Sequence, residues 1–148
     1  MKIFNTLQLK RLHEKILNEY KEQIAQESDE KPIKHDDLIN GEEYIFEVSE
    51  YRLQNVLDEV NEKRADDMLN TSSAVAKKAA MLGAEIIAQR PFQSKNSETG
   101  IAASLSFLML NCFTLDELFY VRGLNEYKQM LTQNDVDGAT KLLKQYLS

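Results

Sequence analysis

Residues 90–100 read RPFQSKNSETG, and the run from Ile101 to Leu115 that follows them carries no charged side chain. Asn96 and Ser97 offer side-chain oxygens of the kind that cap the first turn of a helix. The uncharged run is apolar on almost every side, which is typical of a helix surrounded by neighbours. This stretch therefore predicts a polar loop leading into the central helix of a helical bundle.

Composition extends this interpretation to the whole chain. Two prolines and five glycines among 148 residues leave few breaks between helix-forming segments, so we expect an all-α fold. A chain of this length fits one domain, 1–148, with a single core. The net charge of −6 argues against a nucleic-acid partner, because a phosphate backbone would repel the molecule.

Neither the uncharged segment nor the N-terminus of the chain suggests insertion into a membrane. From Thr99 to Leu115 it is shorter than the roughly 20 residues that a membrane helix needs, and Met1 to Lys10 is too polar for a signal peptide. Cys112 is the only cysteine, which excludes an internal disulfide framework, and we expect it to be a small buried residue. A cytoplasmic protein without a membrane partner is the expectation.

Helical periodicity extends upstream of the decisive stretch. A helix through Ala88 is predicted to begin after the capping residues of segment 70–72, and another to begin near Ser49. The latter turns four apolar side chains inward: Leu53, Val56, Leu57 and Val60. The first helix is expected over Thr6 to Gln26, with a buried face formed by Leu7, Leu9, Leu12, Ile16, Leu17, Tyr20 and Ile24.

Two shorter helices, Gly123 to Leu131 and Asp135 to Leu147, are predicted to close the bundle. Between the first two helices, the charged segment Glu27 to Asn40 is expected to be a surface connection. In Glu42 to Ser49, alternating aromatic and polar residues predict a short strand or flap, or else a hydrophobic loop tucked against the bundle.

The 90–100 stretch resembles the active-site loop of the Fic/Doc family, His-Pro-Phe-x-Asp-Gly-Asn-Lys-Arg-Thr, which leads into an apolar helix. Pro91, Phe92, Asn96 and Thr99 match that pattern in register. Two further segments are similar to the family in the same order along the chain. Leu9 to Leu17 resembles the opening helix of Doc, and Leu105 to Asn111 resembles the end of the helix after the motif.

The resemblance implies a Fic/Doc-like bundle around a central apolar helix. Family members transfer AMP or another part of a nucleotide to a hydroxyl of a target protein, and the Doc branch transfers phosphate from ATP to elongation factor Tu. In the family motif the histidine is the general base, the acidic residue helps to hold magnesium, and the following residues form a phosphate-binding nest. ATP with magnesium is therefore the cofactor that the resemblance implies.

The reactive positions of the motif differ in this chain. Arg90 replaces the histidine, and a guanidinium cannot accept a proton at neutral pH. Ser94 replaces the acid and is a poor magnesium ligand. Lys95 replaces the nest glycine, where positive φ would cost about 1 kcal/mol. Ser97-Glu98 replaces the basic pair, so that Glu98 would repel a triphosphate.

Two hypotheses follow from these substitutions. The first is a pseudoenzyme that acts by binding a protein, with an antitoxin-like segment as one partner because a Doc-like origin suggests a toxin–antitoxin context. The second is an unconventional nucleotide-dependent transferase in which Glu98 replaces the missing base or metal ligand and Arg90 or Lys95 contacts phosphate. In either case Ser94, Lys95, Asn96, Ser97 and Thr99 would form a vestigial phosphate nest.

The remaining candidates favour structural interpretations. His13 lies among apolar residues of a predicted helix and is expected to be packed, whereas His35 is expected to be solvated. Two distant histidines and one cysteine give little support to a metal site, so none is predicted. The acidic clusters at 27–30, 36–37, 42–43 and 66–67 are expected to be solvated faces; the alternative is a partner-binding surface.

Overall fold

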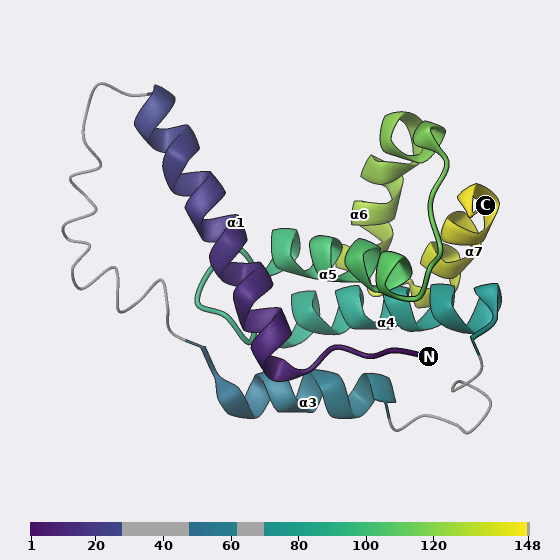
Figure 1. Cartoon of the computed structure of the whole chain (residues 1–148), viewed down its shortest axis with the longest axis horizontal. Coiled ribbons are helices and arrows are strands. Elements are labelled where there is room, and N and C mark those ends of the chain that lie inside the picture. The colour runs from purple at the N-terminus through teal and green to yellow at the C-terminus, as the bar shows by residue number, and fades with distance from the viewer. Residues whose placement is uncertain (28–47, 62–69, 148) are drawn as a thin grey trace.

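A computed structural model describes residues 1–27, 48–61 and 70–147. Within these ranges the chain is helical, and no strand forms; isolated β-bridges join Val48 to Phe92 and Leu115 to Leu147. The all-α prediction is thereby confirmed. The helices of Figure 1 are α1 (Thr6–Glu27), α3 (Glu50–Asn61), α4 (Ser72–Gln89), α5 (Asn96–Leu110), α6 (Leu124–Thr132) and α7 (Val136–Tyr146), with a π-helical turn η3 (Phe119–Gly123) before α6.

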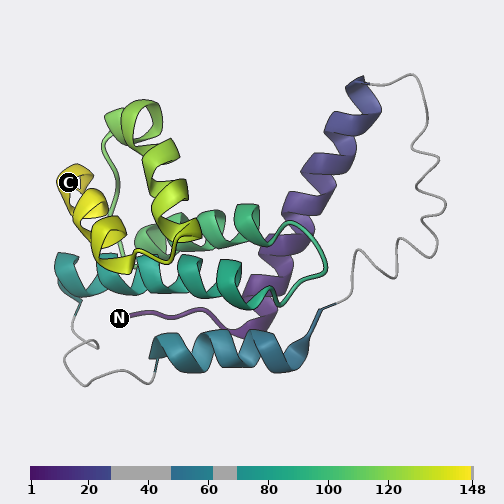
Figure 2. The same cartoon turned by 180° about the vertical axis from the view of Figure 1, so that it is seen from behind.

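α4 is the middle of the bundle. It packs against α3, α5, α6 and α7, and ten of its residues are buried: Val75, Ala76, Lys78, Ala79, Ala80, Met81, Leu82, Gly83, Ala84 and Ile86. α1 packs against α3 and α5 at one end of the bundle, and its C-terminal half projects away from the other helices in both views (Figures 1 and 2). The α4–α5 connection therefore lies where α1, α3, α4 and α5 meet.

Local sequence explains where the helices begin. Asn5 and Gln8 form a reciprocal capping box before α1, because each side-chain oxygen accepts from the other residue's backbone N–H, at 2.8 and 2.9 Å. Thr71 caps α4 by accepting from the Ala74 N–H at 3.1 Å, as predicted. Asp135 caps α7 through the Gly138 N–H at 3.0 Å.

Two facing glycines bring α4 and α5 together. A β-carbon built on Gly100 would lie 2.8 Å from the Gly83 carbonyl oxygen, and one on Gly83 would lie 3.0 Å from the Gly100 oxygen. No side chain fits between backbones at this distance. This contact fixes the start of α5 against α4 and thereby the position of the loop that joins them.

Most predicted boundaries hold to within a residue or two. The four predicted apolar residues of α3 are all buried. The predicted face of α1 is only partly correct, because Leu9 and Leu17 are buried whereas Leu7 and Tyr20 are 52% and 42% exposed. The predicted flap at 42–49 lies outside the described residues except for Val48 and Ser49.

The prediction that neighbours surround the central helix is wrong for one face of α5. Ala103, Ser104, Phe107 and Leu108 are buried, but Met109 is 68% exposed. The open face of α5, formed by Ile101, Ala102 and Leu105, is only half-buried. One side of this helix is therefore available for contact with another molecule.

The prediction that Cys112 is buried is also wrong, because its side chain is exposed. α5 ends at Leu110, before the uncharged run does, and Cys112 follows in a turn with φ 66°. Asn111 is the C-cap residue of α5 and bonds to the N-terminal segment: its Oδ1 accepts from the Lys2 N–H, and its Nδ2 donates to the Lys2 carbonyl at 2.9 Å. No helix in the described ranges is long and apolar enough to cross a membrane.

Candidate binding site around the loop at residues 90–95

The loop between α4 and α5 begins and ends with a left-handed residue. Arg90 has φ 51° and Lys95 has φ 59°, a region in which a residue with a β-carbon is strained. The positive φ of Lys95 is the conformation expected at this position from the resemblance to the Fic/Doc loop, whose pattern has a glycine there. It is also the N-cap residue of α5 and makes no side-chain cap bond, so the prediction that Asn96 or Ser97 caps this helix is wrong.

Asn96 is not free to cap because it holds the loop together. Its Oδ1 accepts from the Phe92 N–H at 3.0 Å, and its Nδ2 donates to the Phe92 carbonyl at 2.8 Å. Asn96, Pro91 and Phe92 are all buried. The amide of Asn96 therefore satisfies both backbone groups of a residue that water cannot reach, and we call this pair of bonds the Asn96 clamp.

His13 joins α1 to the same loop. Its ring stacks on Phe92, with centroids 4.0 Å apart, and its Nε2 donates to the Ser94 carbonyl at 2.9 Å. The carbonyl can only accept, which assigns the proton to Nε2. Burial lowers the pKa of His13, against the opposing effects of the bond to Ser94 and the charge of Glu14. His13 is thus a packed residue, as predicted, but one that contacts the site.

On the side of Arg90, the loop borders an open hollow of about 510 Å³. The Ser49 N–H donates to the Pro91 carbonyl at 2.8 Å, and Arg52 Nη1 of α3 donates to the Arg90 carbonyl at 3.4 Å. We call this space the arginine hollow; its lining residues are Val48, Ser49, Arg52, Arg90, Pro91, Phe92 and Gln93. No carboxylate is among them.

The surroundings of Lys95 are different. Its Nζ lies 3.6 Å from the centre of the Tyr20 ring and 3.5 Å from Glu98 Oε2. These residues line a hollow of about 400 Å³ between α1 and α5, together with Ile16, Glu19 and Ala102. The charge of Lys95 is therefore compensated within the molecule by a carboxylate and an aromatic face.

An apolar hollow of about 510 Å³ adjoins the hollow at Lys95 and extends across α5 to α6. Glu98 and Ala102 belong to both hollows, so together they form one surface, which we call the α5 groove. The α5–α6 part is lined by Ser97, Glu98, Ile101, Ala102, Leu105, Leu124, Lys128 and Thr132. Its floor is the open face of α5.

The residues of the predicted phosphate nest are close together in the chain but differ in their bonds and in their burial. The Ser94 carbonyl is bonded to His13, the Asn96 side chain belongs to the clamp, and Ser97 is exposed. Thr99 is buried, and its hydroxyl has no hydrogen-bond partner among the described residues. Of these five residues, only Lys95 and Ser97 line the α5 groove.

The two catalytic candidates lie in different places. Arg90 lines the arginine hollow, whereas Glu98 lines the α5 groove. The structure thus brings Glu98 to Lys95 but does not bring Arg90 into the same hollow. In the parts of the chain that the structure describes, no group of three or more His, Cys, Asp and Glu residues could hold a metal ion.

Two residues of the site were not predicted. Arg52 lies on the exposed side of α3, and Tyr20 was assigned to the buried face of α1. Both come close to the loop only because α1 and α3 pack beside it, and no local pattern marks either residue.

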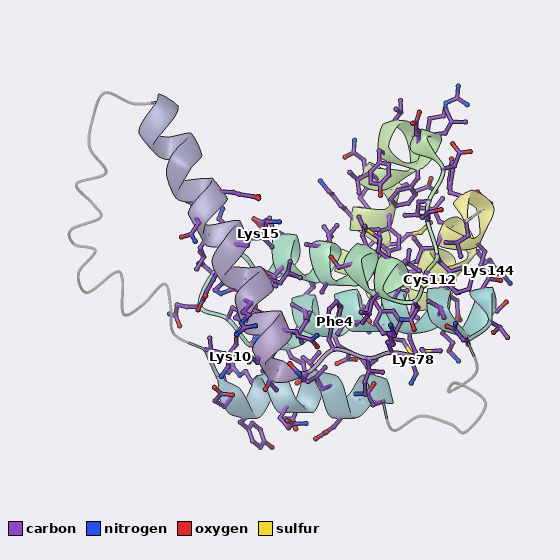
Figure 3. All side chains as sticks on the ribbon, in the orientation of Figure 1. Phe4, Lys10, Lys15, Lys78, Cys112 and Lys144 are labelled. Atoms are coloured by element: carbon purple, nitrogen blue, oxygen red, sulfur yellow. The ribbon has the colours of Figure 1, made fainter. Side chains whose placement is uncertain are left out.

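Lys10 of α1, labelled at the foot of that helix in Figure 3, forms an ion pair with Glu50 of α3 next to His13.

No protein-family model matches this chain, and comparisons with curated proteins and with solved structures found no match.

Proposed function

We propose that this chain is a Fic/Doc-like protein without the ordinary nucleotide-dependent transfer activity, and that it acts by binding another protein. The observation that carries the proposal is the state of the motif loop. Pro91, Phe92 and Asn96, which shape the loop, keep their packing and bonds, whereas the reactive positions have unsuitable chemistry. The proposal treats the loop as a scaffold whose chemical role has been lost.

Three features of the loop disfavour nucleotide transfer. Arg90 aligns with the position of the family's base, and a guanidinium group offers no atom that accepts a proton. Lys95 is already compensated by Glu98 and Tyr20, which leaves less positive charge for phosphate. At an effective dielectric constant of 20, a unit charge about 4 Å away contributes roughly 4 kcal/mol, so Glu98 would offset much of the affinity for a triphosphate.

The α5 groove is the surface that we assign to the protein partner. Ile101, Leu105 and Leu124 give it an apolar lining, while Glu98 and Lys128 provide charges beside them. An apolar centre with polar residues at its edge is typical of protein interfaces. A short segment from a partner, such as an antitoxin-like peptide, would cover the half-buried face of α5.

Calorimetric titration of the protein with ATP, with and without magnesium, tests the loss of transferase function. We expect no detectable heat of binding at millimolar ATP. Magnesium-dependent binding at micromolar ATP, or magnesium-dependent labelling of a protein target, would overturn this part of the proposal.

Affinity capture from native extract tests the protein-binding part. We expect Ile101→Asp to abolish capture of a specific protein, because it places a charge on the floor of the α5 groove. Val121→Asp is the matched control, since Val121 is 80% exposed and does not line the groove. Recovery of no specific protein, or equal capture by both variants, would count against this surface.

One observation favours the second hypothesis, an unconventional transferase. Glu98 belongs to both parts of the α5 groove and is half-exposed, so its carboxylate is accessible to a bound substrate. This hypothesis predicts that Glu98→Gln abolishes nucleotide-dependent turnover while leaving the protein folded. Full activity in Glu98→Gln would remove this residue from any mechanism.

A further inference from the structure

Two arginines from different parts of the chain share the arginine hollow. Arg52 comes from the first turns of α3, and Arg90 is the residue after α4. Both line the same space of about 510 Å³, and both are exposed at its surface. Two arginines therefore border one hollow of a chain whose net charge is −6.

Neither arginine is neutralised by the residues that the structure describes. The described ion pairs are Lys10–Glu50 and Lys95–Glu98, and neither includes an arginine. Glu85, the described carboxylate nearest in sequence to Arg90, accepts from Gln89 Nε2 at 2.7 Å. Ser49 and Gln93, which also line the hollow, are uncharged. An unpaired guanidinium is a strong donor for an oxyanion, and a pair is stronger still.

The backbone acceptors at this side of the loop are already used. The Arg90 carbonyl accepts from Arg52 Nη1 at 3.4 Å, the Pro91 carbonyl accepts from the Ser49 N–H at 2.8 Å, and the Phe92 carbonyl accepts from Asn96. A guanidinium has five N–H groups, so Arg52 keeps donors for an external ligand. Its bond to the loop also orients it in advance, which reduces the cost of ordering it on binding.

From this geometry we propose that the arginine hollow binds one oxyanionic group, a phosphate or a carboxylate, between Arg52 and Arg90. The site does not depend on the motif's phosphate nest, because neither Lys95 nor Glu98 lines it. It is also separate from the α5 groove, so it stands or falls independently of the proposed function.

The test is a titration of the protein with inorganic phosphate at constant ionic strength, followed by the amide signals of Ser49 and Gln93 in NMR spectra. We expect saturable shifts with a dissociation constant in the range of about 1–10 mM. Arg52→Gln and Arg90→Gln should each weaken binding by about tenfold or more, since each removes charge-assisted hydrogen bonds. Arg90→Lys should weaken it less, because it keeps the charge and loses only the fork geometry.

Lys95→Gln is the matched control, since Lys95 belongs to the same loop but points to the other hollow. It should leave the affinity for phosphate within about twofold of wild type at physiological salt, where exposed charges are screened beyond about 8 Å. Absence of saturable shifts up to roughly 20 mM phosphate would overturn the proposal. Unchanged affinity in both arginine-to-glutamine variants would also overturn it.

A parallel titration with acetate distinguishes the two sources of the oxyanion. Phosphate binding about tenfold tighter than acetate would assign the hollow to a phosphate ester, while equal affinities would assign it to a carboxylate side chain. Either result supports an oxyanion site at Arg52 and Arg90.

Discussion

Arg90 and Lys95 lie at the two ends of one short loop, and both have left-handed backbone conformations. They differ in whether a nearby residue compensates the charge of the side chain. Lys95 lies against the Tyr20 ring and beside Glu98. Arg90 shares the arginine hollow with a second cation, and none of the described residues that line it carries a carboxylate. A charge compensated within the molecule contributes to its own structure, whereas an uncompensated one remains available to a ligand.

What separates the two sides is the buried part of the loop. The Asn96 clamp and the stack of His13 on Phe92 hold Phe92 in the interior, beside the buried Pro91. The two cations are thereby kept at different hollows although only four residues lie between them. If the contacts that bury Phe92 are lost, we expect Arg90 and Lys95 to lose their separate surroundings.

Removing the Asn96 clamp should have the largest effect. Asn96→Ala leaves the buried N–H and carbonyl of Phe92 without partners, and we expect it to lower the free energy of unfolding by about 2–4 kcal/mol. Urea unfolding measures this change. Ser97→Ala, at the exposed neighbour, should change stability by less than about 0.5 kcal/mol. A clamp variant as stable as the Ser97 control would show that other contacts hold the loop.

Acid should weaken the packing of the His13 ring on Phe92, and we expect a smaller loss of stability than for Asn96→Ala. Burial lowers the pKa of His13 below its ordinary value of 6.5, so the folded protein resists protonation more than the unfolded chain does. The stabilisation is complete above pH 6.5, where His13 is neutral in both states, and is lost as the pH falls through that value toward the lowered pKa. One such group changes stability by at most about 1.4 kcal/mol per pH unit.

The measurement is the free energy of unfolding between about pH 5 and pH 7, compared with that of His13→Gln, which does not titrate there. Lys10, Glu14 and Glu50 line the hollow beside His13 and are present in both proteins, so the difference between the two curves isolates the histidine. Parallel curves would show that the ring does not carry the pH dependence.

These anchors also show how far sequence can predict this molecule. The apolar period of α3 and the Thr71 cap of α4 are local signals, and both predictions hold because residues a few positions apart determine them. The exposure of Cys112 was mispredicted, because α5 ends at Leu110 and the next residue, Asn111, bonds to Lys2 at the far end of the chain. Hydrophobicity did not mark that boundary, and Cys112 was therefore assigned to the interior.

The site depends even more on long-range packing. The loop was singled out by its resemblance to the Fic/Doc pattern, and the glycine of that pattern at the position of Lys95 agrees with the left-handed conformation that the structure shows there. The partners Arg52 and Tyr20 could not be predicted, because their closeness to the loop arises from the packing of α3 and α1. Sequence thus indicated which loop to study but not how its two charged ends differ.

The smallest predicted effect measures that difference directly, by replacing each left-handed residue with glycine. Glycine adopts positive φ without strain, and Arg90→Gly should raise the free energy of unfolding by about 0.5–1 kcal/mol, since Arg90 has no ion pair among the described residues to lose. Lys95→Gly gains the same relief but loses the contacts with Tyr20 and Glu98. Each contributes about 0.5 kcal/mol at a partly exposed site, so the net change should be near zero. Thermal and urea unfolding of the two variants compares them on one scale. If both substitutions raise the free energy of unfolding equally, the contacts of Lys95 with Tyr20 and Glu98 add nothing to stability. The charge of Lys95 would then be as available to a ligand as that of Arg90.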